Sequence, residues 1–187
     1  MPNPSSILIT GASSGIGKAL ALHFAKAEVT LHLGGRNQTR LDAVAMRCRA
    51  KGATVTTNVS EVTDSQAMSD WIATADAIAN LDLVIANAGV SGGTSNGKEA
   101  KEQVRQIFDV NLGGVLNTVL PILDRMLERQ AGQIAIMSSL ASFLPLPGAP
   151  AYSASKAAIR QYGEALRIAA SSQNVHVSVI CPGFVHS

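Results

Sequence analysis

The chain has 187 residues, of which 47% are hydrophobic and 15% charged, and its formal net charge is +2 at pH 7. This composition excludes intrinsic disorder, and the small, scattered charge argues against a nucleic-acid partner. Two cysteines without metal-ligand or CxxC spacing exclude a disulfide scaffold and favour a reducing compartment. We find no signal peptide and no apolar run of about 20 residues. We therefore expect a soluble cytoplasmic protein without a membrane partner.

Short apolar runs alternate with longer stretches of helical periodicity along the chain. Short apolar runs predict strands, and apolar residues recurring every three to four positions predict helices. In chain order, we expect strands over residues 7–9, 31–33, 53–57, 81–86, 133–137 and 175–180. We expect helices over residues 16–27, 39–51, 65–79, 98–130 and 151–170, the fourth as two segments that meet near Gly113-Gly114.

The alternation of strands and helices is typical of parallel βαβ units. The strands are continuous apolar runs, which indicates burial on both faces of the sheet. We predict an α/β fold: a Rossmann-like, doubly wound parallel sheet of at least six strands with helices on both faces, in a single domain over residues 1–187. Ligands bind such sheets at the carboxyl ends of the strands.

A glycine-rich loop, Thr10-Gly11-Ala12-Ser13-Ser14-Gly15-Ile16-Gly17, joins the first strand to the first helix. Glycines permit a sharp turn, let a pyrophosphate approach the backbone and let the helix pack closely on the sheet. The helix N-terminus adds unpaired N–H groups that favour phosphate. An ordinary flexible turn is the alternative, but the position favours dinucleotide binding by Gly11, Ser13, Ser14, Gly15, Ile16 and Gly17.

The spacing Gly-x-x-x-Gly-x-Gly resembles that of the short-chain dehydrogenase/reductase family, in its branch of shorter single-domain oxidoreductases. The resemblance extends over residues 6–187. Members of that family usually continue with a substrate-covering helical segment and a seventh strand, so we expect this chain to be a truncated form; a reduced protein that lacks this covering segment is the alternative. Because the missing segment carries most of the substrate specificity, the resemblance leaves the substrate open.

The end of the second strand indicates which nicotinamide cofactor the chain binds. It reads Leu33-Gly34-Gly35-Arg36-Asn37 and has no carboxylate to hold the ribose 2′-hydroxyl of NAD. The Arg36 guanidinium can pair with a 2′-phosphate, so we expect NADP(H) rather than NAD(H). A solvated charge at the start of the next helix is the alternative. The resemblance implies further cofactor contacts after later strands, from Asn58, Val59, Asn87, Ala88, Gly89, Pro182, Gly183 and Val185.

Tyr152 and Lys156 are four residues apart and share one face of the long 151–170 helix. A free tyrosine has a pKa near about 10, and a nearby ammonium favours the phenolate. The pair suits acid/base exchange between a carbonyl and an alcohol, although such pairs also occur by chance. The resemblance selects Ser139 over Ser138 as the hydroxyl that orients the substrate oxygen. It also implies that Asn111 holds a water in a proton relay, and that Tyr152 and Lys156 contact the cofactor.

We therefore predict an NADP-dependent oxidoreductase that transfers hydride between nicotinamide and a carbonyl or hydroxyl group of a small or medium organic substrate. A cofactor-binding regulatory protein without turnover, and a sugar-nucleotide epimerase or dehydratase, are the alternatives. The resemblance implies a homodimer or homotetramer. The four histidines, His23, His32, His176 and His186, do not form a metal-ligand set, so we expect no metal.

Overall fold

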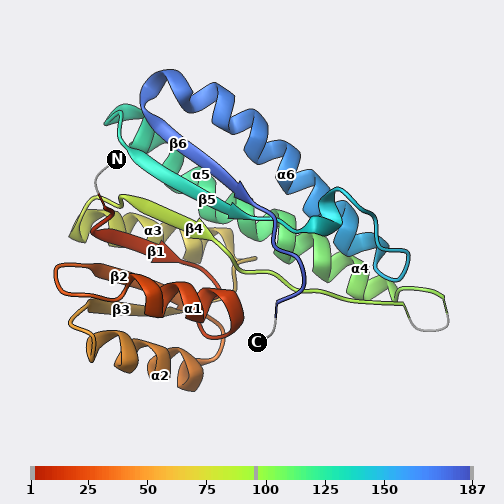
Figure 1. Cartoon of the computed structure of the whole chain (residues 1–187), viewed down its shortest axis with the longest axis horizontal. Helices are drawn as coiled ribbons and strands as arrows, with labels where there is room; N and C mark the ends of the chain where they lie inside the picture. The colour runs from red at the N-terminus through yellow and green to blue at the C-terminus, as the bar shows by residue number, and fades with distance from the viewer. Residues whose placement is uncertain (1–2, 95–96, 186–187) are drawn as a thin grey trace.

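The six predicted strands form one parallel sheet. The structure, a computed structural model, describes residues 3–94 and 97–185. The strands are β1 (Ser6–Ile9), β2 (Thr30–Gly35), β3 (Thr54–Val59), β4 (Leu83–Ala86), β5 (Gly132–Met137) and β6 (Val175–Ile180). Their order across the sheet is β3-β2-β1-β4-β5-β6, and every neighbouring pair is parallel (Figure 1). The predicted doubly wound α/β architecture is confirmed.

Helices cover both faces of this sheet (Figure 1). Helices α1 (Gly15–Phe24) and α2 (Gln38–Arg49) pack on one face. Helices α3 (Ser65–Ile78), α5 (Gly114–Glu128) and α6 (Pro150–Ala170) pack on the other. Helix α4 (Lys101–Phe108) runs into α5 through a π-helical turn, η1 (Asp109–Gly113), close to the predicted junction. Two 3-10 turns complete the elements, η2 (Leu140–Ser142) and η3 (Ser171–Gln173).

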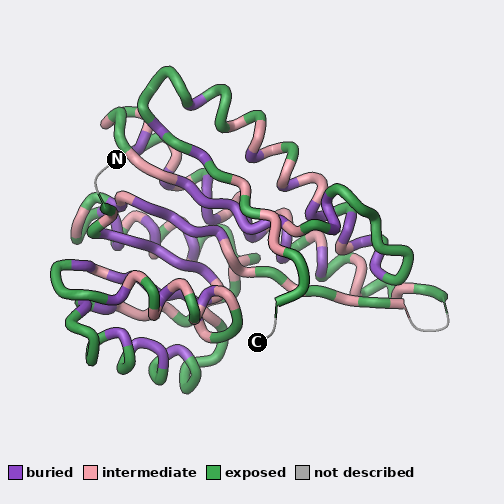
Figure 2. Tube along the Cα trace, viewed as in Figure 1, coloured by how far each residue is buried: buried purple, intermediate pink, exposed green. Residues whose placement is uncertain are grey.

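The central strands are the most deeply buried part of the molecule (Figure 2). Along β1, Ile7 and Ile9 pack beneath α1 and α2, whereas Leu8 packs among residues of α3 and α5. Successive side chains of a strand point to opposite faces, so three consecutive apolar residues bury one strand between two helical layers. The continuous apolar run at the start of the sequence has this physical origin.

The prediction of burial on both faces is wrong for the two edge strands. In β6, Val175 and Val177 are buried under α6, but His176, Ser178 and Ile180 on the opposite face are exposed. The reason is that α1 and α2 lie over β1, β2 and β3 and do not extend across β6 (Figure 1). Strand β3 likewise has exposed residues at both ends.

Some element ends differ from the predicted ones. Helix α1 ends at Phe24 rather than residue 27, because the chain turns back toward β2 through Glu28, whose φ is +67°. Strand β3 extends to Val59, two residues beyond its predicted end. The stretch Lys101–Glu128 is long and apolar enough to cross a membrane by length and composition. Its side chains Val115, Val119, Ile122 and Met126 are buried in the sheet core, so it is a core helix of this fold.

The order of the strands fixes where a ligand can enter. The chain builds β1, β2 and β3 outward in one direction, and α3 then returns it to β4 on the other side of β1. The loops after β1 and β4 therefore leave the sheet in opposite directions. The crevice between them is the place where doubly wound sheets bind ligands.

Candidate active site

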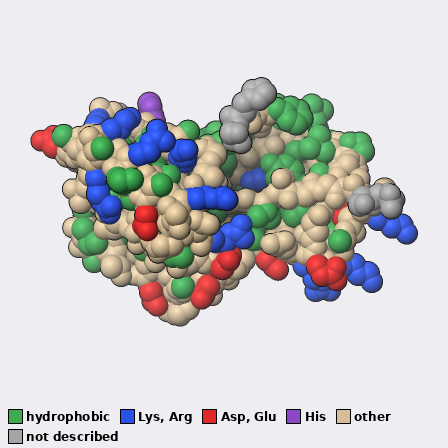
Figure 3. Space-filling view, turned by 90° about the horizontal axis from the view of Figure 1, so that it is seen from below, with side chains coloured by type: hydrophobic (Ala, Val, Ile, Leu, Met, Phe, Trp, Pro, Cys, Tyr) green, Lys and Arg blue, Asp and Glu red, His purple; other side chains and the backbone are tan. Residues whose placement is uncertain are grey.

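A cavity of about 900 Å³ lies at the carboxyl ends of the strands. Figure 3 shows the hollow, with Lys and Arg side chains on one side and hydrophobic side chains on the other. Most of the predicted site residues line it: Gly11, Ser13, Ser14, Gly15, Ile16, Arg36, Asn87, Ala88, Gly89, Ser139, Tyr152, Lys156, Pro182, Gly183 and Val185. The structure thus brings together residues from five loops and helix α6, which are distant in sequence.

The glycine loop is shaped by close backbone contacts. Gly11 has a φ of +67°, and a Cβ there would lie 2.9 Å from the Cα of Ala88. A Cβ on Gly17 would lie 2.3 Å from the carbonyl oxygen of Gly11. Gly17 is buried behind the loop and does not line the cavity, so its role is to let α1 pack against the loop.

The loop after β4 is hydrogen-bonded to the glycine loop. The Asn87 side-chain amide donates to the carbonyl oxygen of Thr10 at 2.9 Å, and the Asn87 and Ala88 backbone N–H groups donate to the Thr10 hydroxyl at 3.0 and 3.1 Å. Asn87 therefore braces the crevice between β1 and β4. This is a structural role that it can keep with a ligand bound.

The start of α1 fits a diphosphate group. Its first N–H groups have no partners within the helix, and the N-cap residue Ser14 makes no side-chain capping bond. Gly15 has a φ of +51° and nothing lies within 4 Å of a Cβ placed there, so its backbone faces open space. No acidic side chain stands in the first turn. Free N–H donors at the positive end of a helix are the donors that a pyrophosphate requires.

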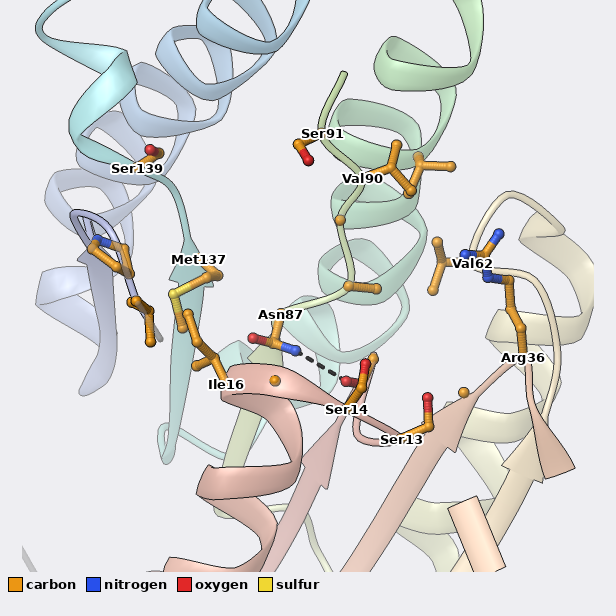
Figure 4. Close-up of a pocket in the computed structure, with 18 of the residues that line it drawn as sticks. Ser13, Ser14, Ile16, Arg36, Val62, Asn87, Val90, Ser91, Met137 and Ser139 are labelled. Carbon is orange, nitrogen blue, oxygen red and sulfur yellow. Dashed lines mark hydrogen bonds between the residues drawn. The ribbon is translucent and has the colours of Figure 1, made fainter. Parts of the chain in front are cut away.

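Two arginines stand at one end of the cavity. Arg36 follows β2 and lies beside Val62 in Figure 4, and Arg40 lies in the first turn of α2. Asn37 caps this helix by accepting the Arg40 backbone N–H at 2.9 Å. A Cβ on Gly35 would lie 3.2 Å from the Ser13 hydroxyl oxygen. An acidic side chain at position 35 would therefore crowd Ser13, whereas glycine leaves this end of the cavity positively charged.

Asn58 and Val59, predicted to contact the cofactor, do not line the cavity. The Asn58 amide instead donates to the Ser60 hydroxyl at 2.7 Å, and Val59 is 45% exposed. The physical reason is the extra length of β3: because the strand continues through both residues, the wall is formed by the loop that follows it. Ser60, Glu61 and Val62 of that loop line the cavity.

The opposite end of the cavity holds the predicted acid/base pair. Tyr152 and Lys156 lie one turn apart on α6, with the Lys156 Nζ 5.8 Å from the centre of the Tyr152 ring. Nζ also donates to the Met137 carbonyl oxygen at 2.8 Å. Lys156 is only 4% exposed, and this burial lowers the pKa of its ammonium from 10.5 to about 8. The group is charged at neutral pH and begins to lose its proton just above it.

The two serines after β5 are separated by their surroundings. Ser138 is buried, and its hydroxyl donates to the Lys156 carbonyl oxygen at 2.8 Å, which ties β5 to α6. Ser139 lines the cavity opposite Val90 and Ser91 (Figure 4). Within the described part of the chain, the single hydrogen bond of its hydroxyl is the one it accepts from the Ala141 N–H, at 3.1 Å. Ser139 is the serine whose hydroxyl still has a proton to donate into the cavity.

Asn111 lies behind the wall rather than on it. It is fully buried in the π-helical turn η1. Its amide oxygen accepts the Val90 N–H at 2.8 Å, and its amide nitrogen donates to the Val90 carbonyl oxygen at 2.9 Å and to the Ser155 hydroxyl at 3.0 Å. Asn111 thus joins the loop after β4 to α6. Single π-turns inside α-helices are frequent at functional sites.

Several residues of the wall were not predicted from the sequence. Arg40, Ser60, Glu61, Val62, Val90, Ser91, Val110, Met137 and Ser138 line the cavity beside the predicted residues. For Arg40 a signal existed, because the first turn of a helix normally favours acidic rather than basic residues. Ser138 was weighed against Ser139 in the sequence, and no local pattern marks the remaining residues. His186, which the sequence analysis considered, lies outside the described residues.

The site combines two kinds of chemistry in one cavity. The glycine loop and the arginines can hold the phosphates of a nucleotide. The phenol, ammonium and hydroxyl of Tyr152, Lys156 and Ser139 can exchange a proton with an oxygen held among them. Figure 4 shows Arg36 and Ser139 on opposite sides of the cavity, so the two functions are spatially separated.

Comparison with known proteins gives a consistent result. The family model described as "short chain dehydrogenase" matches residues 5–187. An uncharacterized oxidoreductase of Myxococcus xanthus is 44% identical over 96% of this chain and 72% of its own length. The 11-beta-hydroxysteroid dehydrogenase A of Sesamum indicum is 33% identical over 97% of this chain, which spans 52% of that relative.

Solved structures give the same picture. The apo form of LigO from Sphingobium sp. strain SYK-6 superposes with a TM-score of 0.87 at 30% identity, over 95% of this chain and 67% of LigO. A second solved structure, from Sinorhizobium meliloti 1021, gives a TM-score of 0.90 at 25% identity over 97% of this chain and 72% of that one. The whole described sheet and its helical layers therefore have counterparts in these proteins.

Proposed function

We propose, since this chain belongs to the short-chain dehydrogenase family, that it is an oxidoreductase which transfers hydride between NADP(H) and a small or medium organic carbonyl or hydroxyl compound. One observation carries the proposal: Tyr152, Lys156 and Ser139 line the same cavity as the glycine loop. We further infer that the chain acts as one cofactor-binding domain.

The protein's own residues supply the proton chemistry. In the direction of reduction, the Ser139 hydroxyl holds the carbonyl oxygen, and Tyr152 donates its phenolic proton to that oxygen as the carbon gains a hydride. In the direction of oxidation, the Tyr152 phenolate takes the proton back. The Lys156 ammonium stabilises the phenolate charge, and Asn111 fixes the loop and helix that border the proton path. The nicotinamide cofactor, when bound, supplies or accepts the hydride.

Three features support NADP(H) over NAD(H). Arg36 and Arg40 line the same end of the cavity, and a guanidinium pairs well with a phosphate. Gly35 stands at the end of β2, where a carboxylate could hold the ribose 2′-hydroxyl, and a Cβ there would lie 3.2 Å from the Ser13 hydroxyl oxygen. Because a 2′-phosphate adds negative charge at this end, the two arginines favour the phosphorylated cofactor.

Cofactor titration followed by a turnover screen tests the function. We expect NADPH to bind more tightly than NADH, and NADPH oxidation to occur with a member of a panel of aldehydes and ketones. Arg36→Ala should abolish the difference between the cofactors, whereas Arg47→Ala, on an exposed part of α2 outside the cavity, should preserve it. Equal binding of both cofactors by the unmodified protein would contradict the NADP assignment.

The catalytic assignment has its own test. Tyr152→Phe should bind NADPH normally but lose about 100- to 10,000-fold in turnover, the range that proton transfer by a positioned side chain contributes. Tyr162→Phe is the matched control, since Tyr162 lies on the same helix and packs in the core. Full activity of the Tyr152→Phe variant would remove Tyr152 from the mechanism.

We also propose a cytoplasmic homo-oligomer. Cys48 is buried as a free thiol, and Cys181 is also free, which suits a reducing compartment. Sedimentation velocity tests the assembly: we expect a dimer or tetramer, and a monomer at micromolar concentration would contradict it.

A further inference from the structure

We propose that Glu61 is a specificity-determining residue that limits how strongly the site prefers NADPH over NADH. The inference rests on the proposed function, because it concerns the end of the cavity assigned above to the adenosine ribose. Glu61 belongs to the loop after β3, whereas the sequence-based prediction of the cofactor rests on residues at the end of β2.

Glu61 is placed opposite Arg36 by the register of two strands. Gly35, the last residue of β2, pairs with Val59, the last residue of β3. Arg36 and Glu61 follow these partners by one and two residues. The Glu61 Oε2 lies 3.9 Å from the Arg36 Nη1, and both side chains are 56% exposed. The carboxylate that the end of β2 lacks is thus supplied by the loop after the neighbouring strand β3.

Glu61 gives this end of the cavity a mixed charge. Among the described residues that line the cavity, Glu61 is the only acidic one, whereas Arg36, Arg40 and Lys156 are basic. Lys156 belongs to the Tyr152 end. The adenosine end therefore carries two positive charges and one negative charge, all on side chains that reach the same space.

A 2′-phosphate and a 2′-hydroxyl respond differently to this carboxylate. A phosphate bound to Arg36 must share the guanidinium with Glu61 and is repelled by its negative charge. A hydroxyl is not repelled and can donate a hydrogen bond to the carboxylate. Glu61 thus weakens binding of NADP(H), which carries the 2′-phosphate, and does not weaken binding of NAD(H), which carries the 2′-hydroxyl. Because the pair is exposed to solvent, we expect an effect of about fivefold in affinity.

The test uses two probes that lack nicotinamide, so that it reports on the adenosine end alone. We would measure binding of 2′,5′-ADP and 5′-AMP by calorimetry to the unmodified chain, to Glu61→Gln and Glu61→Ala, and to a control variant. Glu28→Gln is the matched control, because it also removes one exposed negative charge but lies outside the cavity. Thermal unfolding of each variant checks that it is folded.

We expect both Glu61 variants to bind 2′,5′-ADP about fivefold more tightly, and to bind 5′-AMP equally well or more weakly. The gain should shrink toward zero near about 1 M salt, where the Debye length is about 3 Å. The control should match the unmodified chain. Unchanged or weaker binding of 2′,5′-ADP by both variants would overturn the inference.

Failure of the proposed function has a separate signature. If the unmodified chain binds 2′,5′-ADP no more tightly than 5′-AMP, and Arg36→Ala changes neither affinity, then the NADP assignment itself is wrong. If the unmodified chain prefers 2′,5′-ADP and loses this preference in Arg36→Ala, while Glu61→Gln has no effect, only the role given to Glu61 is wrong.

Discussion

Replacing Lys156 with methionine should stabilise the protein at pH 7 while it abolishes turnover. Lys156 is 4% exposed, and burial lowers the pKa of its ammonium from 10.5 to about 8. A lowered lysine pKa means that the folded state disfavours the charged form that the unfolded chain holds at neutral pH. Methionine has a similar length and carries no charge, so the variant avoids this penalty.

The size of the effect follows from the two pKa values. A change from 10.5 to about 8 corresponds to roughly 3 kcal/mol against the folded state at pH 7. Methionine cannot donate to the Met137 carbonyl oxygen, which Nζ contacts at 2.8 Å, and an unpaired buried acceptor costs about 1–3 kcal/mol. The net gain for Lys156→Met is therefore between about 0 and 2 kcal/mol.

The sign of the pH dependence makes the prediction specific. Between pH 8 and 10.5 the unfolded chain keeps the lysine proton and the folded chain releases it, so the stability of the unmodified protein rises with pH through this window. Methionine does not titrate. The advantage of Lys156→Met should therefore shrink by about 2 kcal/mol between pH 7 and pH 10.

Urea unfolding at pH 7, 8.5 and 10 measures this difference, and other titrating groups cancel because both proteins contain them. Lys26→Met, at an exposed position, is the control and should show a difference that does not change with pH. The reasoning is refuted if Lys156→Met is less stable than the unmodified protein at pH 7, or if its advantage is the same at all three pH values.

Three further substitutions test the surroundings. Gly17→Ala places a Cβ 2.3 Å from the Gly11 carbonyl oxygen, so it should cost about 1–3 kcal/mol in thermal unfolding and weaken NADPH binding; unchanged binding would contradict the loop geometry. Burial lowers the pKa of His32 below its usual 6.5, so the free energy of unfolding should be highest above pH 6.5 and should fall as the pH drops below it. Urea unfolding at pH 5 and 7.5 should show a smaller difference for His32→Leu than for the unmodified protein. Asp76→Ala leaves the Arg129 guanidinium without its 2.8 Å partner and should cost about 3 kcal/mol, which a loss of under about 1 kcal/mol would disprove.

The fold was predictable because its signals are local. The pattern of an apolar strand or of an amphipathic helix can be recognised within a few residues. The alternation of the two is typical of a parallel sheet covered by helices. The exposed face of β6 was not predictable in the same way. The alternation of valine with His176 and Ser178 was present in the sequence, but whether a helix covers that face depends on how far α1 and α2 extend across the sheet.

Site residues were predictable where a sequence motif lies at the end of one strand or within one turn of one helix. Ser139 and the pair on α6 belong to this class, and all three line the cavity. Glu61 does not, because its approach to Arg36 depends on the pairing of Gly35 with Val59 across two strands. A one-residue change in that register would point the carboxylate elsewhere, and no local pattern encodes the register.

The burial of Lys156 raises the question of how the fold tolerates a charge there. A Cβ added to Gly89 would lie 3.4 Å from the Lys156 Nζ and 3.2 Å from the Asn111 amide oxygen, so the glycine keeps the ammonium and the amide close to the same piece of backbone. The Met137 carbonyl oxygen accepts one ammonium proton directly. An ammonium has three protons to donate, and the polar neighbours around it offset part of the cost of desolvation. The remaining cost is the lowered pKa, which brings the Lys156 ammonium close to its titration range at physiological pH, beside the Tyr152 phenol.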